Sequence, residues 1–207
     1  MPLSCRWIGG ALVALLLSAV ACGGTAPARE GGGWELTVYY TVVEAYHGEP
    51  YESISDCAGA PLGRHSSDFL LKVRTEGFGR LTLPVSDDAY LGWSFDRRCW
   101  LLSSQPIGAR DEALRPWRSA AAGPAIALGT RARVTGCGAP IEARACERVK
   151  AAEWVVEDRF GGAAENRRHL DLYIGEEDGA GFETDNPYYF DVRGADVRLA
   201  SSSSSPK

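Results

Sequence analysis

The stretch that decides the fold runs from Trp154 to Gly175, WVVEDRFGGAAENRRHLDLYIG. Two short segments in it, 154–156 and 170–174, are expected to be strands, because apolar residues dominate them. Asp158 closely follows the first segment and Asp171 lies inside the second. An acid inside an apolar strand costs free energy unless it is solvated or hydrogen-bonded, so it is retained either for such an interaction or for a function. Asp171 is therefore the first candidate site residue.

Outside this stretch the chain also favours strands, and the signal for helices is weak. Short helices are expected only near Ala163–Arg168 and around Arg144–Lys150. Many short strands with frequent glycines favour a closed or nearly closed all-β barrel over a sandwich. The further expected strands are Trp34–Glu44, Asp68–Arg74, Arg80–Val85, Gly92–Leu102, Thr130–Thr135 and Asp196–Leu199.

The N-terminus has the order typical of a secretory signal peptide. Arg6 precedes an apolar run, Trp7–Ala21, that is too short to span a bilayer, and small residues end the run before Cys22. Small residues directly before a cysteine resemble the lipobox of bacterial lipoproteins. By that resemblance Cys22 would be the diacylated first residue of an exported, membrane-anchored chain of the cell envelope, facing the periplasm or the outer surface. Ala19 stands where the motif usually has Leu, so ordinary secretion with cleavage nearby is the alternative.

Composition divides the chain into four parts. Residues 1–21 form the signal peptide, and residues 22–33, small and rich in glycine, form a flexible tether. Residues 34–200 are long enough for one domain, and the serine-rich tail, residues 201–207, is expected to be disordered. The net charge is −5, and no basic stripe with interleaved aromatic residues occurs, so nucleic acid is not an expected partner.

Four cysteines remain beyond the leader, an even number that suggests two disulfides in an exported chain. Cys137 and Cys146 flank a short loop and are the favoured pair, which leaves Cys57 and Cys99 as the other. A zinc site is the alternative reading of these residues. It is disfavoured because no C-x-x-C motif occurs and the three histidines are scattered. Neither a metal nor another cofactor is expected.

A series of short motifs occurs in a recognisable order. The segment LRPWRSAAA (114–122) leads through IALGT (126–130) to EDRFGGA (157–163) and HLDLYIG (169–175). This order resembles the three-aspartate (3D) domain and the catalytic barrel of membrane-bound lytic transglycosylase A, which show I-P-x-G-T, D-x-G-G-A and I/F-D-x-Y/F-x-G motifs. The resemblance implies a six-stranded double-psi β-barrel, the fold also used by expansins. Its first strand would lie at Thr37–Val43.

The chain departs from these families in four places, one of which is the segment Ile126–Leu128, which lacks the proline of I-P-x-G-T. The first family aspartate aligns near Ala122 and Gly123, where no acid occurs. The connector Ala164–Arg168 replaces the usual I-K-G, and residues 48–109 have no counterpart, so we expect them to be an insertion after the first barrel strand.

The resemblance implies cleavage of peptidoglycan between N-acetylmuramic acid and N-acetylglucosamine, with a 1,6-anhydro end as product. Asp171 would be the acid/base, with its pKa raised by the apolar residues around it, and Asp158 the second acid. Thr41, Tyr40 and His169 would contact the sugar. Trp117 is a candidate stacking platform, as are Trp93 and Trp100.

Two other functions are consistent with the same residues. The missing first acid and the altered connector favour a non-catalytic barrel, similar to expansins, that binds peptidoglycan or another polysaccharide. A small secreted scaffold is the third possibility, in which Asp171 would be a structural acid. The deciding observation is whether Asp158 and Asp171 line an open groove or are sealed inside the barrel.

Overall fold

The computed structural model describes residues 29–85, 88–160 and 168–200. The predicted signal peptide, Cys22, most of the tether, the helix near Ala163–Arg168 and the serine-rich tail lie outside the described residues. Within these ranges, none of the helices combines the length and the apolar character needed to cross a bilayer.

The described chain is mainly strand. The strands are β1 (Arg29–Val43), β2 (Tyr51–Ser55), β3 (Pro61–Ser66), β4 (Phe78–Val85), β5 (Asp88–Ser94), β6 (Cys99–Ser103), β7 (Ser119–Ala122), β8 (Arg131–Gly136), β9 (Trp154–Asp158), β10 (His169–Glu176) and β11 (Asp191–Ala200). The helices are α1 (Ser67–Glu76), α2 (Ala143–Ala151) and α3 (Phe182–Asp185), with a 3₁₀ turn at Glu44–Tyr46.

Six of the strands form a closed ring, which confirms the predicted fold class. The order is β10-β7-β9-β8-β11-β1, and the ring closes because β1 also pairs with β10. The pairs β1–β10 and β7–β9 are parallel and the other four are antiparallel. Exchanging β1, β7 and β8 with β9, β10 and β11 leaves every pairing unchanged. This two-fold symmetry of connectivity is that of a double-psi barrel.

The barrel interior is filled by alternate residues of the strands, as period-2 patterning requires. In β1 and β10 the inward residues are aliphatic or aromatic, whereas Thr37, Tyr39, His169 and Asp171 lie on the outer face. Trp154 is the largest of the fully buried side chains, and its indole donates to the carbonyl of Val149 in α2 over 3.1 Å. The candidate site therefore lies outside the barrel.

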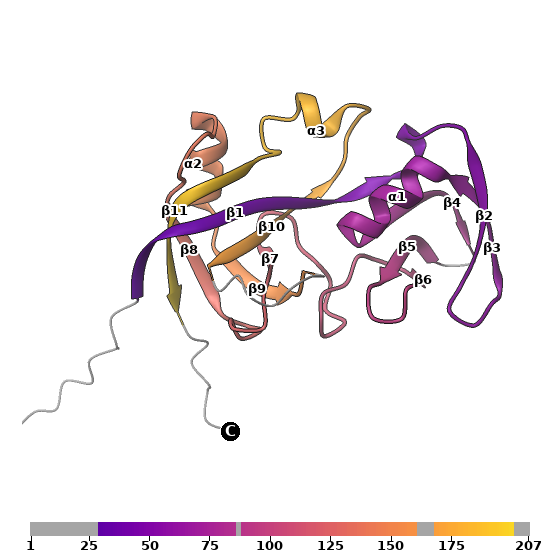
Figure 1. The fold of residues 1–207 in the computed structure, drawn as a ribbon, viewed down its shortest axis with the longest axis horizontal. Coiled ribbons are helices and arrows are strands. Elements are labelled where there is room, and N and C mark those ends of the chain that lie inside the picture. The colour runs from indigo at the N-terminus through magenta and orange to yellow at the C-terminus, as the bar shows by residue number, and fades with distance from the viewer. Residues whose placement is uncertain (1–28, 86–87, 161–167, 201–207) are drawn as a thin grey trace, which may run out of the picture.

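A second group of elements, β2 to β6 with α1, follows β1 in the chain and lies beside the barrel (Figure 1). It is joined to the barrel by β1, whose last residues, Val42 and Val43, pair with Gly79 and Arg80 of β4. Helix α1 lies so close to β4 that a Cβ on Gly79 would meet Val73 at 2.4 Å. One long strand thus belongs to both groups.

The strand predicted at Asp68–Arg74 is wrong, because these residues form most of α1. The apolar residues Phe69, Leu70 and Val73 fit a helical face as well as a short strand, and a seven-residue run does not separate the two periods. The side chain of Ser66 favours the helix, because it accepts the backbone N–H of Phe69 as an N-cap. Gly77 ends the helix at φ +95°. The strands β2, β3 and β7 were not predicted.

Both disulfides have the predicted pairing. The Cys57–Cys99 bond joins the turn between β2 and β3 to β6. The Cys137–Cys146 bond joins the residue after β8 to α2. Each bond therefore restrains one of the two groups of elements.

His47 forms one of the polar links between the two groups. Its Nδ1 lies 2.6 Å from Asp68 of α1, and its Nε2 lies 3.0 Å from Glu177, which follows β10. Both His47 and Glu177 have buried side chains, whereas Asp68 is exposed. The imidazole thus provides a partner for a carboxylate that solvent does not reach.

We expect His47→Ala to lower the free energy of unfolding by about 2–3 kcal/mol, because it leaves the Glu177 carboxylate buried with one partner fewer. Urea denaturation followed by tryptophan fluorescence measures the change. Lys150→Ala, which breaks an exposed pair with Glu147, is the control and should change it by less than about 0.5 kcal/mol. Equal effects of the two substitutions would contradict a linking role for His47.

Candidate active site

Asp171 projects from the outer face of β10 toward β1. The parallel register places it opposite Thr37, and the antiparallel register on the other side places it opposite Ala121 of β7. Its sequence neighbours Leu170 and Leu172 point into the barrel core. They therefore do not surround the carboxyl directly, and its burial arises from what covers the outer face.

A chain of hydrogen bonds fixes the Asp171 carboxylate. The Thr37 hydroxyl donates to Asp171 Oδ1 over 2.7 Å, and the Thr37 Oγ1 itself lies 2.8 Å from His169 Nε2. Because a hydroxyl has one proton, Nε2 is the donor in the second bond. Burial lowers the pKa of His169, which favours the neutral ring, and that ring stacks on Phe160 at 4.7 Å.

Asp158 is held in place by two donors. Its Oδ1 accepts the backbone N–H of Arg159 at 2.8 Å, and its Oδ2 accepts the hydroxyl of Tyr39 at 3.3 Å. The guanidinium of Arg159 donates to the carbonyls of Ala122 and Gly123 at 3.1 and 3.2 Å. Arg159 thus ties the end of β9 to the end of β7, beside Asp158.

The two acids line one cleft of about 260 Å³ between the barrel and the second group of elements. The barrel contributes Asp171, Asp158 and Phe160, and the opposite wall consists of the end of α1 and the strands after it. The opposite wall includes Glu76, Phe78, Trp93 and Phe95. Phe95 is 45% exposed and adds an apolar surface to this wall. The carboxylates are therefore not sealed inside the barrel.

Glu76 brings a third carboxyl group into the cleft. Its Oε2 accepts the backbone N–H of Tyr40 at 3.2 Å, at the point where the β1–β10 register is irregular between Tyr39 and Thr41. A bulge of this kind frees a ladder N–H for another partner. The bulge in β1 is thus the point where the end of α1 meets the barrel.

The pKa values of all three acids are raised, chiefly by burial. Burial raises the pKa of Asp171 to about 7, against the hydrogen bond from Thr37 and with help from the charges of Asp158 and Asp191. Burial also raises the pKa of Asp158 to about 6 and that of Glu76 to about 8. For Glu76 the charge of Asp171 adds to the effect of burial. The cleft therefore holds carboxyl groups that can be protonated near neutral pH.

Three of the residues predicted to contact sugar lie outside this cleft. Thr41 is fully buried and bonded to the Tyr173 hydroxyl at 2.7 Å. Tyr40 points into the core, where its hydroxyl donates to Glu183 at 2.8 Å. Trp117 lies on another groove, beside α2. The fourth predicted contact, His169, lies beside the cleft, because it is hydrogen-bonded to Thr37 and stacks on Phe160, which lines the cleft.

Sequence reasoning missed Thr37, Tyr39, Glu76 and Phe95. Thr37 and Tyr39 carried a usable signal, since they alternate with Leu36 and Val38 and so share the outer face of β1. Glu76 carried none, because it reaches the site through the contact of α1 with a bulge. Within residues 29–85, 88–160 and 168–200, no cluster of three or more His, Cys, Asp or Glu side chains is arranged to hold a metal ion.

The barrel with its second group of elements is the fold of lytic murein transglycosylases. No protein-family model matches the chain, and no curated protein matches it. The chain is similar to the crystal structure of a membrane-bound lytic murein transglycosylase from Agrobacterium tumefaciens, with 14% identity over 80% of this chain and 73% of that chain and a TM-score of 0.54. It is also similar to Escherichia coli MltA with bound chitohexaose, with 14% identity over 82% and 72% and a TM-score of 0.56.

These similarities confirm, for the fold, the predicted resemblance to lytic transglycosylase A. The 3D-domain assignment stays a prediction.

We expect Asp171→Asn to raise the free energy of unfolding at pH 8 relative to the wild type, by on the order of 1–3 kcal/mol, and to change it little at pH 3. The folded-state pKa of about 7 lies above the unfolded value near 4, so the wild type loses stability as pH rises through this window. Asparagine is neutral throughout and avoids the loss. Urea titrations at both pH values test this, and a difference independent of pH would contradict it.

Proposed function

We propose that this chain is an exported protein of the cell envelope, lipid-anchored through Cys22, that cleaves the glycan strands of peptidoglycan as a lytic transglycosylase. The observation that carries the proposal is the Asp171 carboxyl, held by Thr37 in a cleft and protonated near neutral pH. The similarity in fold to lytic murein transglycosylases supports the general function.

In the proposed reaction Asp171 acts first as acid and then as base. Its proton goes to the glycosidic oxygen as the bond to the muramoyl C1 breaks, so the leaving sugar departs with a neutral hydroxyl. The C6 hydroxyl of the same muramoyl residue then attacks C1 and returns its proton to Asp171. The products are a new sugar end and a 1,6-anhydro ring, and no water is consumed.

The other cleft residues have supporting roles in this proposal. Asp158 and Glu76 lie on opposite walls, where their oxygens can accept hydrogen bonds from sugar hydroxyls, and the charge of Asp158 favours the protonated form of Asp171. Trp93 and Phe95 provide apolar faces for pyranose rings. Trp93 is held by an edge contact with Trp100 at 4.7 Å, so its ring is fixed before a ligand binds.

The second candidate is a non-catalytic polysaccharide-binding barrel. It is favoured by the residue opposite Asp171, since Ala121 occupies the position on β7 that the two-fold symmetry relates to Asp171. The cleft therefore lacks one of the acids that the resemblance leads us to expect, although its aromatic wall remains suited to sugar.

Digestion of purified peptidoglycan tests the first candidate. Wild-type protein should release 1,6-anhydromuropeptides detectable by mass spectrometry, and Asp171→Asn should lower the rate at least about 100-fold, the usual contribution of a general acid. Asp196→Asn, at an exposed position of β11, is the control and should keep the wild-type rate. If the wild type releases no anhydro products, catalysis is excluded. Binding to insoluble peptidoglycan that is lost in Phe95→Ala would then support the binding barrel.

The rate of cleavage should fall about tenfold per pH unit above pH 7, because only protonated Asp171 is the acid in the first step. Asp158→Asn removes a charge that raises the pKa of Asp171, so it should move this decline to lower pH. Initial rates between pH 5 and 9 measure both effects. A profile that stays level to pH 9 would contradict the role of Asp171.

A further inference from the structure

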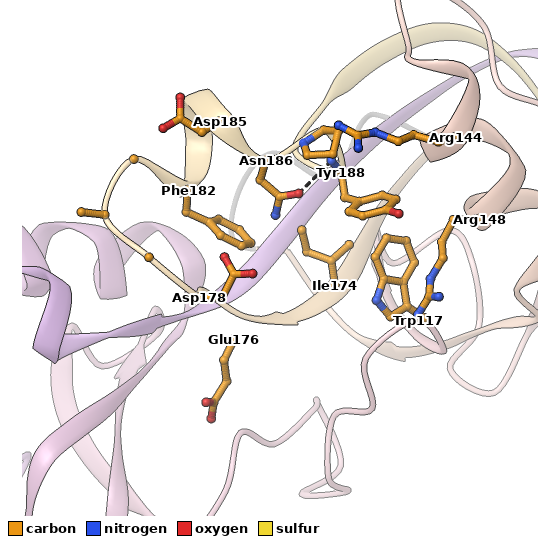
Figure 2. Close-up of a pocket in the computed structure, with 14 residues that line it drawn as sticks. Trp117, Arg144, Arg148, Ile174, Glu176, Asp178, Phe182, Asp185, Asn186 and Tyr188 are labelled. Carbon is orange, nitrogen blue, oxygen red and sulfur yellow. Dashed lines mark hydrogen bonds between the residues drawn. The ribbon is translucent and has the colours of Figure 1, made fainter.

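A second groove, of about 550 Å³, opens at the end of the barrel where β10 ends, and the reaction proposed above does not use it. Its walls are α2 on one side and the segment around α3 on the other (Figure 2). Its floor includes Trp117, which precedes β7, and Ile174 of β10.

One end of the groove is aromatic and positively charged. The guanidinium of Arg148 lies 4.6 Å from the centre of the Trp117 ring, and the ring of Tyr188 meets Trp117 edge-on at 5.2 Å. Trp117 has φ +59°, a conformation that is rare for a bulky residue and is found mainly where the surroundings enforce it. Its backbone N–H is held by the carbonyl of Tyr173, so the unusual backbone fixes the ring in the groove.

The other end is negatively charged. Asp178 and Asp185 lie at the α3 end, whereas Arg144 and Arg148, one turn apart on α2, lie at the other (Figure 2). Arg144 donates a hydrogen bond from Nε to the carboxylate of Glu142 at 3.1 Å, and both side chains are exposed. The groove thus separates positive from negative charge along its length, which suits a ligand that carries both carboxylate and ammonium groups.

The groove lies within reach of the cleft. The same strand, β10, carries Asp171 in the cleft and Glu176 at the edge of the groove, five residues apart, which is roughly 17 Å at about 3.3 Å per residue. An extended peptide of four or five residues spans a similar length.

We propose that this groove binds the stem peptide carried by the muramoyl residue whose glycosidic bond lies at Asp171. The peptide carboxylates pair with Arg144 and Arg148, its free ammonium group pairs with Asp178 and Asp185, and its aliphatic parts cover Trp117 and Tyr188. This inference rests on the proposed function, because a muramoyl substrate in the cleft is what places a peptide at the groove.

Calorimetric titration tests the inference in the Asp171→Asn protein, which does not consume the ligand. The ligands are a GlcNAc–MurNAc tetrasaccharide with stem pentapeptides, the same tetrasaccharide without them, and the free pentapeptide L-alanyl-γ-D-glutamyl-meso-diaminopimelyl-D-alanyl-D-alanine. The peptide-bearing tetrasaccharide should bind about tenfold more tightly than the bare one. Arg144→Ala combined with Arg148→Ala should reduce this ratio to about one, whereas Arg131→Ala, an exposed arginine on β8, should leave it near ten.

The outcomes separate this inference from the proposed function. Equal binding of both tetrasaccharides by the parent protein would overturn the peptide site while supporting the glycan cleft. Binding of neither tetrasaccharide would contradict the proposed function, and the free pentapeptide then decides the groove by itself. Pentapeptide binding that depends on Arg144 and Arg148 supports the site, and its absence overturns it.

Discussion

The parallel pairing of β1 with β10 is the constraint on which the rest of the structure depends. It closes the ring of six strands, and its register sets Thr37 beside Asp171. The same strand, β1, continues past the ring to pair with β4, so it also fixes where the second group of elements lies. The acid, its hydrogen-bond donor and the opposite wall of the cleft are therefore positioned by one strand.

This arrangement removes most water from the acids but leaves them accessible from the cleft. A carboxyl on the outer face of a lone barrel would be solvated and would keep an ordinary pKa. Here the end of α1 and the aromatic residues of the opposite wall cover the outer face, so water is largely removed while the cleft stays open. Desolvation then exceeds the stabilising bond from Thr37 and raises the pKa of Asp171.

The sequence predicts the barrel and its acids better than it predicts the cleft. Strands β8, β9 and β10 follow from alternation and β-branched residues, and the motif order points to Asp158 and Asp171. Strand β7 was missed because Ser119–Ala122 contains only small residues, which have little strand propensity. All four of these residues are buried.

The choice of Tyr40 and Thr41 over Thr37 and Tyr39 has a related cause. The bulge in β1 shifts its pairing with β10 between Tyr39 and Thr41, and bulges depend on tertiary contacts that single-sequence patterns do not contain. Glu76 could not be predicted for the same reason. It lies at the end of a helix whose residues 68–74 were predicted as a strand, and it enters the site because α1 docks on that bulge.

The central claim is that Asp171 is a carboxylic acid that stays protonated up to near-neutral pH. Carbon-13 NMR of the side-chain carboxyl groups, titrated from pH 3 to 9 and assigned by comparison with Asp171→Asn, measures this directly. We predict an Asp171 signal that titrates with a pKa of about 7. A pKa near 4, the value of a solvated aspartate, would contradict the account.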